Sequence, residues 1–83
     1  MSAVRQNHAL YLRDLGCLIK EMAKEAKRSK DDAGEDGRDY ELGRLMAMHE
    51  VVSLMQQQAV AFELPFEDIC LDDIDPERDL VSG

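Results

Sequence analysis

The clearest apolar repeat in the chain lies at residues 45–62 and reads LMAMHEVVSLMQQQAVAF. A helix brings side chains that recur every three or four positions onto one face. The residues at this spacing are Leu45, Met48, Val52, Met55, Ala59 and Phe62. Val51 and Leu54 widen the apolar face to roughly half of the helix circumference, at about 100° per residue. The repeat therefore predicts a helix with more apolar surface than one neighbouring helix covers.

The flanking residues set the expected ends of this helix at about 39–63. The carboxylate of Asp39 can accept backbone N–H bonds at the first turn. Pro65 disfavours helical dihedral angles at the residue before it, which is Leu64.

A second helix is predicted at about residues 3–29, which contain neither proline nor a run of β-branched residues. A stripe with heptad-like spacing runs along it and consists of Val4, Tyr11, Leu15, Leu18 and Met22. The segment between the two helices, residues 30–38, is rich in charge and glycine and is predicted to be a loop. Two helices of similar length joined in this way most simply form an antiparallel hairpin.

The sequence thus predicts an all-α fold, with residues 1–83 as one domain. With a turn near Gly34, the numbers of facing residues sum to about 68, which sets Val52 beside Leu15 and Gly16. An apolar face as wide as that of the second helix indicates an interface. A two-fold homodimer, in which two hairpins form a four-helix bundle, is the simplest closed assembly. The expected interface residues are Leu45, Met48, Val51, Val52, Met55, Ala59 and Phe62. The alternative is a monomer whose C-terminal segment folds back over the same surface.

Residues 64–83, hereafter the C-terminal arm, alternate acidic and apolar side chains. Such a segment is a candidate for docking onto a protein partner. The residues expected to do so are Phe66, Ile69, Asp72, Asp73 and Ile74. The alternative is a solvated terminus anchored by its first apolar residues. We expect packing to about Leu71 and mobility beyond about Pro76. A basic line on the first helix, formed by Arg13, Lys20, Lys24 and Lys27, is the nearest expected counter-charge.

The formal net charge of −8 makes binding to nucleic acid or to an anionic membrane unlikely as a function. No stretch approaches the roughly 18 consecutive apolar residues that a membrane span needs. The first residues also lack the apolar core of a signal peptide. The sequence therefore predicts a cytoplasmic protein.

Few side chains have the spacing that catalysis or metal binding needs. Asp73, Asp75, Glu77 and Asp79 alternate as calcium ligands do, but Arg78 stands where the calcium loop needs glycine. His8 and His49 are expected to make ordinary hydrogen bonds. We therefore predict no catalytic residue, no cofactor and no metal site. The predicted function is a non-catalytic interaction or regulatory protein; the alternative is an acidic decoy or antitoxin-like inhibitor of a nucleic-acid-binding protein, and a small enzyme or metal-binding protein ranks third.

Cys17 and Cys70 show neither CxxC spacing nor a secretory context. Two such cysteines in a cytoplasmic protein are expected to be reduced thiols. On this interpretation, neither a reducing agent nor a chelator changes the melting temperature.

Overall fold

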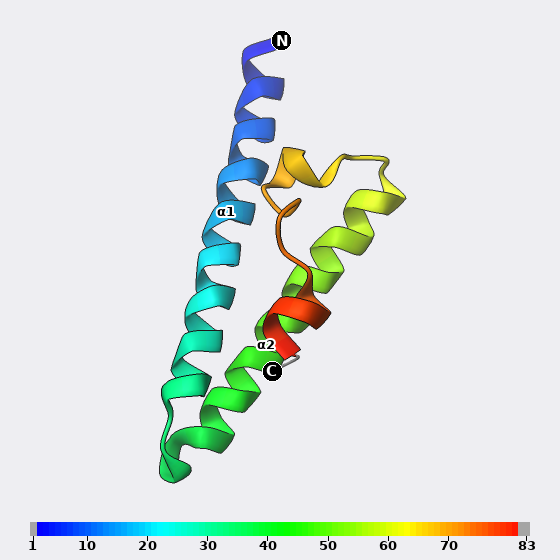
Figure 1. The fold of residues 1–83 in the computed structure, drawn as a ribbon. Helices are drawn as coiled ribbons and strands as arrows, with labels where there is room; N and C mark the ends of the chain where they lie inside the picture. Colours follow the sequence, from blue (N-terminus) through cyan, green and yellow to red (C-terminus); the bar gives the residue numbers. More distant parts are fainter. Residues whose placement is uncertain (1, 82–83) are drawn as a thin grey trace.

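The computed structural model describes residues 2–81, and the side chains of residues 6–81, as a set of helices without a strand (Figure 1). The long helices are α1 (Ser2–Asp32) and α2 (Glu35–Ala61), and they pack as an antiparallel hairpin. The C-terminal arm contains a short 3-10 helix, η1 (Phe66–Ile69), and a short π-helix, η2 (Pro76–Val81). The predicted all-α hairpin is confirmed.

The connection between the helices is shorter than the loop expected at residues 30–38. Only Ala33 and Gly34 are outside the helices, and α2 begins at Glu35 rather than near Asp39. The physical reason is electrostatic, because Glu35 and Asp36 place carboxylates in the first turn of α2, where the helix dipole favours negative charge.

The end of α2 lies close to where Pro65 predicted it. The N–H of Leu64 donates to the carbonyl of Ala59 at 2.8 Å, and the N–H of Glu63 donates to the carbonyl of Val60 at 3.1 Å. This pair of bonds is a Schellman motif, which needs a left-handed residue after the helix. Here that residue is Glu63, with φ of 58°.

Replacing Glu63 with glycine is expected to raise the free energy of unfolding by about 0.5–1 kcal/mol, because glycine adopts the left-handed conformation without a Cβ clash. Urea unfolding followed by circular dichroism measures the change. Glu63→Ala is the matched control: it removes the same charge but keeps a Cβ, so it should not stabilise. An equal gain in both variants would show that the charge, not the backbone, matters.

The two long helices diverge from the turn, and the arm runs back into the space between them (Figure 1). Small residues near the turn, Ala23 and Ala26, are fully buried and allow close packing against Leu45. Other buried apolar residues are Val52, Ala59, Ile69, Leu71, Ile74 and Leu80. Four of these come from the arm, so the core is formed by three parts of the chain rather than by two helices.

The arm is packed against the long helices up to Leu80, beyond the expected limit of about Leu71. Pro76 and Leu80 are buried, although mobility was predicted beyond about Pro76. Two of the acidic residues, Asp75 and Asp79, accept backbone N–H groups of the arm. The carboxylate of Asp75 accepts the N–H groups of Glu77 at 3.0 Å and Arg78 at 3.3 Å, which supports the first turn of η2.

The molecule is elongated, with extents of 53 × 20 × 16 Å and a radius of gyration of 14.6 Å. A compact chain of this length has a radius of gyration of about 12 Å. Its accessible surface is 5976 Å², against about 5,000 Å² for a typical monomer of this mass. The fold therefore leaves an unusually large surface in water.

Candidate functional site

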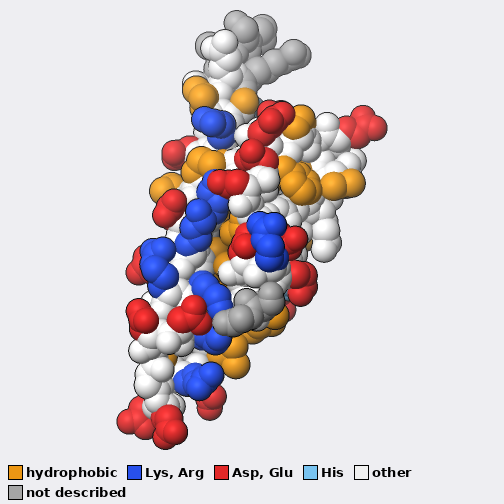
Figure 2. Space-filling model, viewed as in Figure 1, with side chains coloured by type: hydrophobic (Ala, Val, Ile, Leu, Met, Phe, Trp, Pro, Cys, Tyr) orange, Lys and Arg blue, Asp and Glu red, His pale blue; other side chains and the backbone are white. Residues whose placement is uncertain are grey.

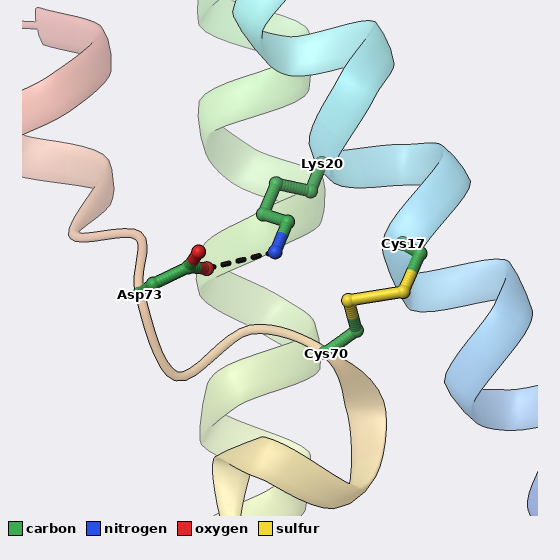
Figure 3. Close-up of a disulfide and its surroundings, with 4 residues drawn as sticks. All are labelled: Cys17, Lys20, Cys70 and Asp73. Carbon is green, nitrogen blue, oxygen red and sulfur yellow. Dashed lines mark hydrogen bonds and ion pairs between the residues drawn. A yellow bond between two sulfur atoms is a disulfide. The ribbon is translucent and has the colours of Figure 1, made fainter.

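A disulfide bond between Cys17 and Cys70 ties the arm to the middle of α1 (Figure 3). The prediction of two reduced thiols is wrong for this structure. The cysteines are 53 positions apart in sequence, but their Cα atoms are 5.2 Å apart, within the usual range for a disulfide. Sequence spacing could not reveal the pair, because the return of the arm between the helices creates the proximity.

Gly16, next to Cys17, explains how the arm comes so close to α1. A Cβ atom built on Gly16 would collide with the backbone carbonyl of Ile69 in η1. The predicted neighbour of Gly16 was Val52 on α2, and the structure places the arm there instead. An isolated glycine inside a helical pattern is a signal of such close packing, and it was the one available clue to this contact.

Lys20, one turn further along α1, is buried and forms an ion pair with Asp73 of the arm, with Nζ and Oδ1 2.8 Å apart (Figure 3). The expected counter-charge for the arm is therefore confirmed at this residue. Figure 2 shows Lys and Arg side chains following α1 beside the acidic side chains of the arm. The hydrogen bond from Lys20 lowers the pKa of Asp73 below its ordinary value of 3.8.

The other side of the arm is fixed by α2. The side-chain amide of Gln56 donates to the carbonyls of Leu71 at 3.0 Å and Ile74 at 2.9 Å. His49 makes the ordinary hydrogen bond expected of it, with its Nε2 3.0 Å from a carboxylate oxygen of Glu77. Gln56 was not singled out from the sequence, where it is one of three consecutive glutamines.

Acid is expected to loosen the arm. A carboxyl whose pKa is lower in the folded state stabilises the fold above its unfolded pKa and stops doing so as pH falls through the folded value. Asp73 is one such group, and Asp79 is another because a hydrogen bond from Arg78 lowers its pKa to about 2. Their contribution should be constant from pH 7 to about pH 5 and decline from about pH 4 to pH 2.

Thermal unfolding of the wild type and of Asp73→Asn at several pH values tests this dependence. The variant should be less stable at pH 7, and the difference should shrink as pH falls toward 2. Asp72→Asn is the matched control, since it removes one charge from the adjacent position without touching the ion pair. A gap between wild type and Asp73→Asn that stays constant with pH would contradict the role given to the ion pair.

The structure places the expected partner-docking residues in different environments. Ile69 and Ile74 are buried, Phe66 is half-buried and Asp72 is exposed. Asp73 is exposed but engaged by Lys20. The two isoleucines therefore expose little surface to a partner while the arm is packed.

The residues expected in a dimer interface also differ in how deeply they are buried. Leu45, Val52 and Ala59 are buried within the chain, and Met48 and Met55 are half-buried. Val51 and Phe62 are exposed. The arm thus covers one side of the hairpin, as the monomer alternative supposed, and the other side stays uncovered.

An apolar groove of about 550 Å³ lies on the hairpin beside η1. Its lining residues are Leu12, Leu54, Met55, Gln58, Ala59, Phe62, Leu64 and Ile69. At about 100° per residue, Leu18 and Met22 of α1 and Val51 of α2 project on the side of their helices away from the arm. We call this surface the open face. It comprises the groove together with Leu18, Met22 and Val51.

Large side chains on the open face are unusually exposed for apolar residues. The exposed fraction is 55% for Leu18, 56% for Leu54 and 73% for Phe62. Contiguous apolar surface of this kind marks a contact site for another molecule.

Within residues 2–81, no group of three or more His, Cys, Asp or Glu side chains is arranged to hold a metal ion. The helices that the structure describes include none with the length and apolar character needed to cross a membrane. Comparison of the chain with protein-family models, with curated proteins and with solved structures found no match.

Proposed function

We propose that the protein is a non-catalytic interaction module that pairs with a second copy of itself through the open face and offers its C-terminal arm to a protein partner. The open face is the observation that carries the proposal. It crosses both helices of the hairpin, so two copies placed face to face form a four-helix bundle. Neither the pairing nor the partner requires a catalytic residue, a cofactor or a metal.

The size of the uncovered surface supports pairing. A stable interface of standard size buries about 800 Å² of each partner. The chain exposes 5976 Å², roughly 1,000 Å² more than a monomer of its mass typically does. The elongated shape contributes to this excess, and one such interface would remove a similar area from water.

The charges of the arm favour an interaction module over an acidic decoy. A decoy of a nucleic-acid-binding protein must present its carboxylates to a basic surface. In this chain Asp73 pairs with Lys20, Glu77 with His49 and Asp79 with Arg78. These acids are already engaged, which leaves fewer free carboxylates for imitation of a phosphate backbone.

Sedimentation equilibrium at micromolar concentration tests the pairing. We expect the wild type to have twice the monomer mass, and Leu54→Glu to have the monomer mass because it places a charge at the centre of the apolar contact. Leu42→Glu is the matched control: Leu42 is also exposed on α2, but it projects about 120° around the helix from Leu54 and on the side opposite Val51. That control should remain dimeric. A monomer mass for the wild type would overturn the pairing.

The proposal includes a cytoplasmic location, and this location determines the redox conditions that the disulfide meets. Cellular reductants keep most cytosolic thiols reduced. A protein that works there meets conditions under which the bond between Cys17 and Cys70 can open.

A further inference from the structure

We propose that the disulfide between Cys17 and Cys70 is a redox-sensitive latch, whose reduction by a dithiol releases the C-terminal arm from α1 and makes its apolar residues available to a protein partner. The inference rests on the proposed function of the arm and adds the condition under which the arm can act. It resolves a conflict in the structure, because the residues best suited to docking, Ile69 and Ile74, are buried when the arm is packed.

The latch lies where the arm is most constrained. Cys70 ends η1 in the left-handed conformation, with φ of 63°, which residues other than glycine disfavour. Next to it, the backbone carbonyl of Ile69 lies so close to Gly16 that a Cβ atom on residue 16 would not fit. The left-handed conformation of Cys70 is also supported by capping bonds, in which the N–H of Cys70 donates to the carbonyl of Glu67 at 3.3 Å and that of Leu71 donates to the carbonyl of Phe66 at 3.0 Å. The bond to Cys17 ties this end of η1 to α1. Once it opens, η1 and Cys70 can move away from α1 together.

The contacts that remain after reduction are few. Gln56 donates to two carbonyls of the arm, and Lys20 pairs with Asp73. The side chain of Asp73 is 61% accessible and that of Lys20 is 11% accessible, so solvent screens the pair on one side only. The helices of the arm have four and six residues, and isolated helices of that length are not stable in water. The arm without its crosslink therefore depends on these polar contacts and on the burial of its apolar side chains.

The bond lies beside an open hollow on α1. Cys17 is half-buried and lines an open hollow of about 530 Å³ on α1, together with Arg13 and Asn7. A thiolate of the dithiol attacks Sγ of Cys17, which breaks the S–S bond and expels the Cys70 thiolate. The second thiol then resolves the mixed disulfide. The dithiol loses two electrons and becomes a cyclic disulfide, and the protein gains two electrons and two protons as two thiols.

Release of the arm would expose two surfaces together. One is the arm itself, with Ile69, Leu71 and Ile74 next to acidic residues that no longer face α1. The other is the space between the helices that the arm now fills. A partner that combines an apolar groove with basic residues matches the freed arm, because it would bury the isoleucines and face Asp72 and Asp73.

Hydrogen–deuterium exchange of the oxidised and dithiothreitol-reduced protein tests the latch. Amides of residues 66–81 should exchange faster after reduction, by up to about a thousandfold, the limit set by the chain entropy of a crosslink between residues 53 positions apart. Amides of residues 23–48, around the helix turn, should accelerate by a smaller factor than those of the arm. Cys17→Ser should show the fast exchange without reductant, and dithiothreitol should not alter it further.

Two results would overturn the latch. One is an arm that exchanges at the same rate in both redox states. The other is an equal increase in the exchange rates of the arm and of the helix turn. That result would show that the disulfide stabilises the whole fold rather than the arm in particular. Because the reduced chain is less stable, the comparison is repeated in sucrose, which favours the folded state.

The same exchange experiment on Leu54→Glu separates the latch from the pairing. Arm release in a monomeric Leu54→Glu protein would support the latch without any contribution from the dimer. A latch that fails while the wild type remains dimeric would leave the pairing intact, so the two proposals can fail independently.

Discussion

Replacing Cys17 with serine is expected to lower the free energy of unfolding by about 4 kcal/mol. The bond connects residues 53 positions apart, and a crosslink over that separation restricts the unfolded chain by about this amount in the chain-entropy model. Small domains are stable by only about 5–15 kcal/mol in total, so the loss is a large part of the stability. Near the hairpin turn the two long helices bury only Ala23, Ala26 and Leu45 against each other. This small core cannot compensate for the lost stabilisation by the disulfide.

Urea unfolding measures the effect. Wild-type protein in dithiothreitol should match Cys17→Ser, and the double variant with Cys70→Ser should match the single variant because the bond is already absent. Dithiothreitol should not change either variant. A decrease in the free energy of unfolding below about 1 kcal/mol would show that the disulfide adds little beyond the packing of the arm. It would agree with the expectation from the sequence that a reducing agent does not change the melting temperature.

Gly16→Ala is expected to destabilise the fold by about 3 kcal/mol. The new methyl group would collide with the backbone carbonyl of Ile69, and backbone cannot move aside as the end of a flexible side chain can. Overpacking of this kind typically costs about 1–3 kcal/mol, and more where backbone must shift. Here η1 would have to leave α1, which takes Ile69 out of the core and pulls on the disulfide.

Gly43→Ala is the matched control for this variant. Gly43 also lies inside a long helix, but nothing lies within 4 Å of a Cβ built there. Alanine is favoured over glycine in helix interiors by about 1 kcal/mol, so this variant should gain stability. Thermal and urea unfolding should therefore move in opposite directions for the two substitutions. A gain in both would rule out the close approach of η1 to α1.

The long helices and their order were predictable because they depend on local pattern. The apolar spacing from Leu45 to Phe62 predicts the face of α2 that contacts the rest of the molecule, and Pro65 predicts where α2 ends. The turn was less predictable. Charged residues such as Glu35 and Asp36 are as typical of a loop as of a first helical turn, and the choice between the two depends on a small electrostatic difference.

The sequence also predicted that the arm would contact α1 through opposite charges, because a basic line on α1 and an acidic arm attract each other. It did not predict that Lys20 would be the partner of Asp73, or that the arm would be packed as far as Leu80. Whether a mixed acidic and apolar segment is solvated or packed depends on the shape of the space that it can enter.

The local pattern of apolar residues, turns and proline determined two antiparallel helices and an apolar surplus on α2, because helix formation depends on neighbours three and four positions away. The divergence of the helices, the entry of the arm between them and the bond between Cys17 and Cys70 were decided only by tertiary structure. The contacts of the arm with α1 join residues that are 53 positions apart. Their contact requires a glycine on α1 to admit the backbone of Ile69, and that fit exists only once all three segments are in place.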